Sequence, residues 1–221
     1  MKNTLDKSML SNYLSKQLDN FFPDTKFSIS VEDIIIERSL EKSLFCFEGI
    51  NSPIYREADG SPKFNYLHGD QYATFLYFVS RVAFESGNEE VYYKAALLNK
   101  ALHGIDLFGH VKMPSRFLLV HPVGTIIGRA KIGENIVIYQ GVTIGGKHDR
   151  GGSINYPRIA SDCVLYANST ILGRTELPDK TIVGANSFIT DFKVKEENSL
   201  VVGSHPSIRV LDNSKTFSFF S

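Results

Sequence analysis

The chain has 221 residues with 24 basic and 24 acidic side chains, a balance that gives no electrostatic reason to expect a nucleic acid or an anionic membrane as the main partner. Its two cysteines, Cys46 and Cys163, lie far apart without metal-ligand spacing, which predicts neither a disulfide framework nor a metal site. The N-terminal stretch is too polar for a signal peptide and no apolar run is long enough to cross a bilayer, so we expect a cytoplasmic protein.

The first hundred residues carry apolar side chains at helical spacing. A first helix is expected up to Pro23, with one apolar face made of Leu5, Met9, Tyr13, Leu14, Leu18 and Phe21. A second helix is expected over residues 31–47, with Ser30 followed by Asp33 as its candidate N-cap. Residues 51–65 are rich in turn formers and predict an irregular loop.

Two more helices complete this half of the chain. Residues 69–86 predict a strongly apolar, buried helix that ends at Gly87. Residues 89–102 predict a helix that is capped by Asn88 and followed by Gly104. We therefore expect an all-helical region over residues 1–104.

Beyond Val120 the apolar pattern has a period of six. The residues on this grid are all aliphatic, namely Ile126, Ile132, Ile138, Ile144, Ile159, Leu165, Ile171, Leu177, Val183 and Ile189. Most residues four positions later are small or β-branched, as Val142, Cys163, Ser169, Thr175, Thr181 and Ser187 illustrate. A period of six fits short strands separated by regular corners, each strand pointing one aliphatic side chain inward, and stacked coils then bury a continuous column. A β-sandwich or barrel with coincidental spacing is the alternative.

The grid is interrupted once, at residues 147–158, which are polar and rich in glycine. A segment extruded from a regular wall can form one side of a cleft, and long loops in regular architectures often carry function. The alternative is a tolerated surface excursion.

The β-helical half resembles the serine acetyltransferases, which are hexapeptide-repeat acyltransferases. The likeness rests on His121 with Gly124 three residues later, the Gln140–Gly146 block, and the tripeptide Pro157–Ile159 after the loop. It extends into the helical part and covers residues 60–210 approximately. It implies an α+β fold in which the helices of 1–104 precede a left-handed parallel β-helix over 105–210, with the loop 147–158 extruded and a tail at 211–221.

The same resemblance implies a homotrimer or a dimer of trimers, with active sites between neighbouring subunits. It also implies acetyl-CoA as cosubstrate, no metal, a small-molecule acceptor, and a place in cysteine biosynthesis. Serine acetyltransferases that dock onto the next enzyme of that pathway end in isoleucine. This chain ends in "TFSFFS", so that partnership is not expected.

His121 is the candidate catalytic base. Transfer of an acetyl group from a thioester to a hydroxyl needs a base, and imidazole can take the hydroxyl proton and return it to the departing thiolate. The resemblance places His121 at the catalytic position and Asp106, fifteen residues earlier, as the aspartate that holds the ring. Apolar neighbours predict a setting that keeps the imidazole neutral. The alternatives are a structural histidine and, for Asp106, an ordinary turn residue.

The resemblance also assigns binding residues. Backbone amides of Gly145, Gly146, Ala167 and Ala185 would contact the pantetheine arm of acetyl-CoA, and Lys193, Lys195 and Arg209 are candidates for its phosphates, or else solvated surface charges. The acceptor would also contact Asp59. Val120, Asn155 and Tyr156 stand where the family has charged or ionisable serine-binding groups, and Arg158 is a candidate substitute.

We therefore expect an acetyl-CoA-dependent O-acetyltransferase with serine as its default acceptor. Because Val120, Asn155 and Tyr156 replace charged contacts, a sugar or another small alcohol is an alternative acceptor. A non-catalytic β-helix scaffold is the alternative outside enzymes.

Overall fold

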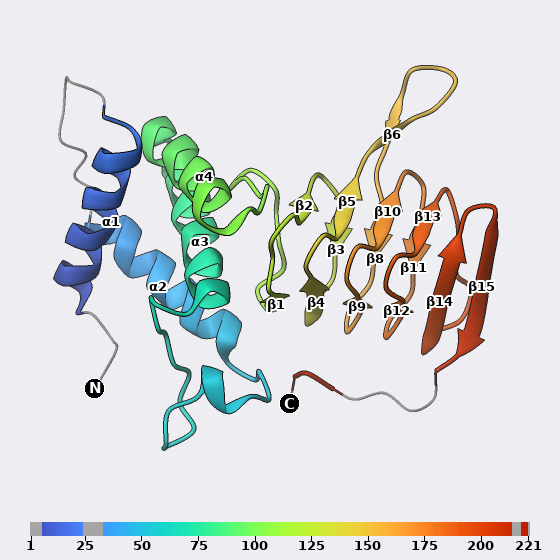
Figure 1. The fold of residues 1–221 in the computed structure, drawn as a ribbon, viewed down its shortest axis with the longest axis horizontal. Helices are drawn as coiled ribbons and strands as arrows, with labels where there is room; N and C mark the ends of the chain where they lie inside the picture. The colour runs from blue at the N-terminus through green and yellow to red at the C-terminus, as the bar shows by residue number, and fades with distance from the viewer. Residues whose placement is uncertain (1–5, 24–32, 214–217, 221) are drawn as a thin grey trace.

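The molecule joins a helical part to a column of short strands, as Figure 1 shows. The computed structural model describes residues 6–23, 33–213 and 218–220. Within these ranges the four α-helices are α1 (Lys7–Phe21), α2 (Asp33–Phe47), α3 (Gly69–Ser86) and α4 (Glu89–His103). A short 3-10 helix, Pro53–Tyr55, lies in the predicted loop between α2 and α3. The predicted fold class, helices followed by parallel strands, is confirmed.

Local sequence signals set the helix ends. The Asn88 side chain accepts a hydrogen bond from the Val91 amide at 3.0 Å and caps α4. Gly87 and Gly104 adopt the left-handed conformation that ends α3 and α4, with φ of 77° and 68°. These three assignments agree with the sequence prediction. The helix α2 begins at Asp33, and the predicted cap Ser30 lies outside the described residues.

The buried face of α1 is narrower than predicted. Leu10, Leu14 and Leu18 are fully buried, whereas Met9 and Phe21 are exposed. Residues four apart lie on one stripe of a helix, so the stripe through Leu10 faces the other helices and the assignment of Met9 and Phe21 to it was wrong. Leu5 lies outside the described residues.

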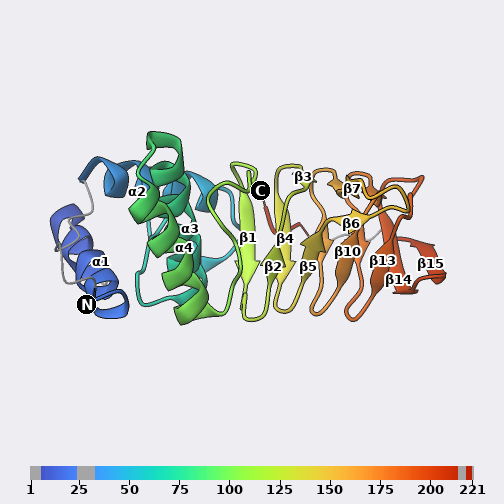
Figure 2. The ribbon, with the colours of Figure 1, turned by 90° about the horizontal axis from the view of Figure 1, so that it is seen from above.

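The strands wind into coils with three faces, seen side-on in Figure 1 and from above in Figure 2. The first face consists of β1 (Phe117–Val120), β4 (Ile136–Tyr139), β9 (Val164–Leu165), β12 (Ile182–Val183) and β14 (Ser199–Ser204). The second face consists of β2 (Ile126–Ile127), β5 (Thr143–Gly145), β10 (Thr170–Leu172) and β13 (Phe188–Thr190). The third face consists of β3 (Lys131–Ile132), β8 (Arg158–Ile159) and β11 (Glu176–Leu177).

Successive coils pair in parallel, so that the grid residues stack in register. Ile138, Leu165 and Val183 are aligned on the first face, and Ile144, Ile171 and Ile189 on the second. All six are fully buried. The small residues of the repeat are buried as well, because they fill the corners between faces; they are Val142, Cys163, Ser169, Thr175, Thr181 and Ser187.

The first coil departs from the grid. Ile127, at 2% exposed, is the inward residue of β2, whereas the predicted Ile126 is 48% exposed. The chain advances eight positions from Leu119 to Ile127 but only six from Ile138 to Ile144, the equivalent step one coil later. The corner at residues 121–125 is therefore two residues longer than its counterpart, and this shift moves Ile126 to the outside.

Both ends of the column are covered. At the first end the buried Phe117 packs against Tyr77 and Phe78 of α3, with ring centroids 5.8 Å apart in each pair. At the far end β15 (Ser207–Asp212) pairs with β14 in antiparallel fashion. Such caps protect the exposed faces of a solenoid. The division of the chain into domains at residue 104 stays a prediction, because one packed core runs through both halves.

The end of the chain returns to the start of the column. Phe220 forms a β-bridge with Ile50, and the Asn51 amide donates to the Phe219 carbonyl at 2.8 Å. The Phe219 ring lies edge-on to Tyr139 on the first face. These contacts tie the last described residues to the loop that follows α2. None of the helices in the described ranges is long and apolar enough to cross a membrane.

Candidate functional site

Two corners of the β-helix carry most of the predicted site residues. The corner between the first and second faces, here the His121 corner, comprises residues 121–125, 140–142, 166–169 and 184–187 of successive coils. The corner between the second and third faces, here the hairpin corner, comprises residues 128–130, 146–157 and 173–175. Within one chain the whole second face separates them.

His121 follows β1 directly and opens the lengthened corner. Its φ of 48° lies in the left-handed region, and its side chain is exposed. The turn thus directs the ring away from the column, and the apolar setting expected for the imidazole stays a prediction. The exposure also argues against a buried structural histidine.

Asp106 runs alongside β2. Its backbone forms a parallel bridge with Ile126, donating to the Thr125 carbonyl at 2.9 Å and accepting from Ile127 at 3.0 Å. Its Oδ2 accepts a hydrogen bond from Lys100 Nζ of α4 at 2.6 Å. Among the described residues no hydrogen bond joins Asp106 to His121, so the predicted carboxylate-imidazole pair stays a prediction.

Three predicted residues lie in line along the His121 corner. Ala167 and Ala185 occupy the same corner as His121 in later coils. Backbone hydrogen bonds run along it: Gly141 donates to Val123 at 3.0 Å, and Asn186 donates to Ala167 at 2.9 Å. Successive coils are therefore hydrogen-bonded to one another along this corner, and His121 lies in its first, longer turn.

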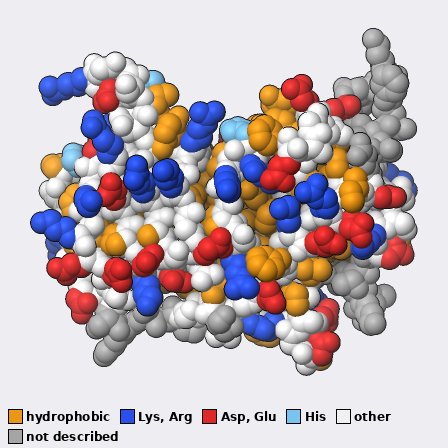
Figure 3. All heavy atoms as spheres, turned by 180° about the vertical axis from the view of Figure 1, so that it is seen from behind, with side chains coloured by type: hydrophobic (Ala, Val, Ile, Leu, Met, Phe, Trp, Pro, Cys, Tyr) orange, Lys and Arg blue, Asp and Glu red, His pale blue; other side chains and the backbone are white. Residues whose placement is uncertain are grey.

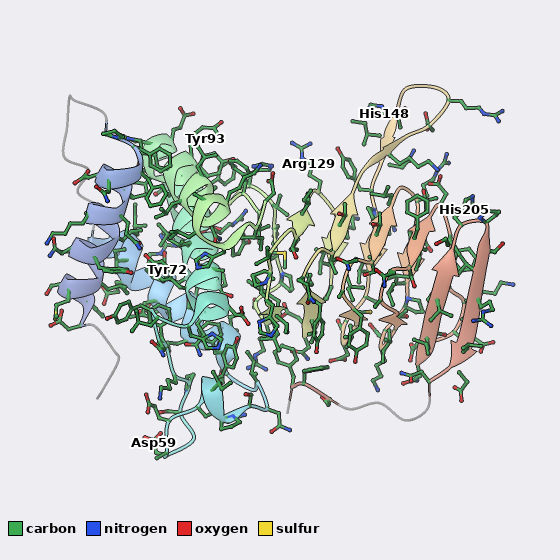
Figure 4. All side chains as sticks on the ribbon, viewed as in Figure 1. Asp59, Tyr72, Tyr93, Arg129, His148 and His205 are labelled. Atoms are coloured by element: carbon green, nitrogen blue, oxygen red, sulfur yellow. The ribbon has the colours of Figure 1, made fainter. Side chains whose placement is uncertain are left out.

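The interrupted stretch is a β-hairpin that projects from the column (Figure 4). Its strands β6 (Lys147–His148) and β7 (Ile154–Asn155) pair in antiparallel fashion. Lys147 Nζ anchors the base, donating to Asp191 at 2.6 Å and to Thr190 at 3.1 Å. The predicted extruded loop thus has a regular structure of its own.

Asp149 organises the turn of the hairpin. Its Oδ1 accepts from the amides of Gly151 and Ser153, each at 3.0 Å, and its Oδ2 accepts from Asn155 Nδ2 at 3.2 Å. The hydrogen bond from Asn155, followed by those from the backbone, lowers the pKa of the Asp149 carboxyl. The ionised form of Asp149 therefore holds Asn155 in place.

Gly146 makes room for Tyr156 at the base of the hairpin. A Cβ on Gly146 would lie 2.6 Å from Ile154 Cγ2 and 2.8 Å from Tyr156 Cε1. Real Cβ atoms do not approach so closely, so glycine permits the present position of the Tyr156 ring. The tyrosine is 36% exposed, and within the described residues its hydroxyl has no hydrogen-bond partner.

Asn155, Tyr156 and Arg158 line one hollow of about 510 Å³ beside the hairpin. A second hollow of about 510 Å³ continues along the third face and contains Lys193 and Lys195. The remaining predicted residues lie apart from these. Arg209 is exposed on β15. Asp59 is in the loop before α3 at the opposite edge of the molecule from His148 on the hairpin (Figure 4), where its side chain accepts from Ser61.

Sequence reasoning missed a row of charges on the third face. Lys131, Arg158 and Glu176 are aligned in register, and Lys193 bridges to Glu176. Each of these charged residues directly precedes an inward aliphatic residue of the third face. The sequence could therefore have predicted the row, because a charged residue recurs at this position of every third strand. Among the described residues no group of three or more His, Cys, Asp or Glu side chains is arranged to hold a metal ion.

No family model matches the chain. Among curated proteins it resembles the serine acetyltransferase of Staphylococcus epidermidis, with 34% identity over 93 residues, which is 42% of this chain and 43% of that protein. The serine acetyltransferase of Staphylococcus aureus is 31% identical over 93 residues, again 42% of this chain and 43% of that protein. The match thus spans less than half the length of these relatives.

Solved structures resemble nearly the whole chain. A serine acetyltransferase from Vibrio cholerae has a TM-score of 0.71 at 19% identity and covers 96% of this chain and 81% of its own. One from Neisseria gonorrhoeae, solved with serine, has a TM-score of 0.68 at 22% identity, covering 94% and 84%. One from Brucella abortus, solved with coenzyme A, has a TM-score of 0.67 at 17% identity, covering 96% and 84%. The fold is the one that serine acetyltransferases have, helices followed by a left-handed parallel β-helix, and the resemblance to them extends to the sequence over 93 residues.

Proposed function

We propose that the chain is an acetyl-CoA-dependent O-acetyltransferase of the serine acetyltransferase type. The observation that supports this most is the position of His121, which is exposed in the first turn of a corner where Ala167 and Ala185 follow in later coils. Acetyl-CoA as the cosubstrate is supported by a solved relative that holds coenzyme A, and a small hydroxyl acceptor by one that holds serine.

In the proposed reaction His121 takes the proton from the acceptor hydroxyl as its oxygen attacks the thioester carbonyl carbon. The tetrahedral intermediate then collapses, the carbon-sulfur bond breaks, and the imidazolium returns the proton to the departing thiolate. The products are an acetyl ester and the free thiol of coenzyme A. Direct transfer is proposed rather than a thioester intermediate on Cys46 or Cys163, because both cysteines are buried and burial raises the pKa of each thiol to about 12.

Asp106 is proposed to orient the imidazole. Its Oδ2 is held by Lys100, which leaves Oδ1 for the ring nitrogen of His121. A carboxylate in this place fixes the tautomer and stabilises the transient imidazolium.

A complete site is proposed to form between subunits. One chain keeps the His121 corner and the hairpin corner a whole face apart, and the hairpin projects outward. A homotrimer, which the resemblance implies, would bring the His121 corner of one subunit to the hairpin of the next. Exposed apolar side chains on the intervening second face, Ile126 and Phe188, support such packing. The helices would join two trimers.

The acceptor is proposed to be a small-molecule hydroxyl. The resemblance implies serine as the acceptor and a place in cysteine biosynthesis. A sugar or another alcohol is the second candidate, because Val120, Asn155 and Tyr156 offer neutral contacts at the serine-binding positions.

The test is release of thiol from acetyl-CoA with serine and with a panel of sugars and amino alcohols. We expect His121→Ala to lower kcat by roughly 10²–10⁴-fold, the usual contribution of general base catalysis. His205→Ala, on the turn between β14 and β15, is the matched control and should retain activity. An unchanged rate in His121→Ala would favour the scaffold alternative, and no thiol release with any acceptor would exclude the enzyme.

A further inference from the structure

The two hollows on the third face lie next to each other along one groove. They share the lining residues Lys131, Arg158 and Glu176. We call this the basic groove, because six Lys and Arg side chains and a single carboxylate line it: Arg129, Lys131, Arg158, Arg174, Lys193, Lys195 and Glu176. Figure 3 shows Lys and Arg side chains gathered on this side of the β-helix.

The positive charge of the groove is not neutralised from within. Its one carboxylate, Glu176, is engaged by Lys193 at 2.6 Å, and this contact lowers the pKa of Glu176. Arg174 lies 3.9 Å from Asp149 and stays largely exposed. Among the described residues no ion pair is made by Arg129, Lys131 or Arg158. Because the chain as a whole has zero net charge, this concentration is local.

The hairpin adds neutral groups to the same hollow. Asn155 and Tyr156 line it together with Arg129 and Arg174. The Asn155 amide nitrogen donates a hydrogen bond to Asp149, and its amide oxygen can accept one from a ligand. The Tyr156 hydroxyl can donate or accept. The hairpin end therefore offers hydroxyl-binding groups in the same hollow as the guanidinium groups of Arg129 and Arg174.

We propose that the acceptor alcohol carries phosphate, such as a sugar phosphate or a nucleotide-linked sugar; this rests on the proposed acetyl transfer. Guanidinium groups bind phosphate oxygens through paired, charge-assisted hydrogen bonds, and a phosphate monoester carries about 1.5–2 negative charges at neutral pH. The hairpin hollow alone, about 510 Å³, falls in the range of about 300–1,000 Å³ that encloses ligands much larger than an amino acid.

The phosphates of acetyl-CoA could bind to the same cations as a phosphate on the acceptor. Substitutions at the two ends of the groove distinguish these two ligands. Lys193 and Lys195 lie only in the far hollow, whereas Arg129 and Arg174 lie only in the hairpin hollow. Charge removed at the hairpin end should therefore act on the acceptor rather than on the cosubstrate.

The experiment compares wild type with the double variant Arg129→Gln/Arg174→Gln. Lys112→Gln, which removes an exposed cation from a different hollow on the helical part, is the control. Thiol release is measured with paired acceptors, glucose against glucose 1-phosphate, N-acetylglucosamine against its uridine diphosphate conjugate, and serine alone. We expect at least tenfold higher kcat/KM for a phosphorylated member, and at least a tenfold rise of its KM in the double variant only. The KM for acetyl-CoA should change less than twofold.

Three results would overturn the proposal: serine or a neutral sugar used as efficiently, an unchanged acceptor KM in the double variant, or a rise in the KM for acetyl-CoA alone. If no acceptor is turned over, the proposed function fails, and calorimetric titration with glucose 1-phosphate and with the uridine diphosphate conjugate still tests the groove. Binding of one of them that weakens in the double variant and not in Lys112→Gln supports it. Absence of binding, or equal binding in all three proteins, overturns it.

Discussion

Two glycines at equivalent places in the repeat should respond differently to the same substitution. Gly133 follows the inward Ile132 as Gly145 follows the inward Ile144. A Cβ at Gly133 would lie 2.6 Å from backbone atoms of the next coil, whereas a Cβ at Gly145 would lie 3.5 Å from a leucine side chain. Carbon contacts are favourable from about 3.5 Å, so Gly133→Ala requires the next coil to move by roughly 0.9 Å.

Gly133→Ala should therefore lower the free energy of unfolding by about 1–3 kcal/mol, as other overpacked sites do. Gly145→Ala should change it by less than about 1 kcal/mol, with a small gain because alanine restricts the unfolded chain. Urea unfolding followed by circular dichroism, at one protein concentration, measures both variants. Values that agree within about 0.5 kcal/mol would refute the reasoning, since the coils at Gly133 would then not be in close contact.

Three further predictions concern the hairpin and the tail. Gly146→Ala should raise the KM of the acceptor about tenfold or more, because the added methyl group displaces Tyr156 and a misplacement of about 1 Å can lower the rate up to about 100-fold. Steady-state kinetics at saturating acetyl-CoA measure this KM. An unchanged KM contradicts a contact between Tyr156 and the acceptor. The Asp149 carboxyl has a lowered pKa in the folded chain, so its hold on the hairpin is present above the ordinary aspartate pKa and is lost as the pH falls through the lowered one. Amide exchange in the hairpin should therefore accelerate in acid, and Asp149→Asn should remove that pH step; exchange with the same acid step in both proteins speaks against it. Phe220→Ala should lower the free energy of unfolding by about 1.5–3 kcal/mol, because only 9% of the residue is exposed; the exposed Leu67→Ala is the control in urea unfolding, and equal effects would show that the tail does not dock.

The parts of the fold that depend on local signals could be predicted from the sequence. Asn88, Gly87 and Gly104 act on backbone groups a few positions away, so their helix ends followed directly. The period of six was equally local, because each inward aliphatic such as Ile171 needs only a neighbouring coil to cover it. The period of six wrongly predicted that Ile126 points inward. It assumes corners of equal length, and the corner at His121 is longer.

The site could be predicted less completely, for two physical reasons. The basic groove arises from side chains such as Lys131 and Arg158 that become neighbours only when the coils stack, and no motif marks that alignment. The environment of His121 depends on what lies opposite its exposed side chain, and the apolar neighbours along the chain do not determine that. The roles of His121 and Asp106 remain predictions.

The contact between Phe220 and Ile50 joins residues that lie before and after the whole β-helix in the sequence. Each coil adds about 4.8 Å of height, so duplication of one repeat would lengthen by that amount the span between β15 and Ile50 that the last phenylalanines must bridge. During synthesis the coils can wind one upon another as they emerge, whereas this pairing forms only after them. The contact of the tail with Ile50 therefore depends on the number of coils in the β-helix.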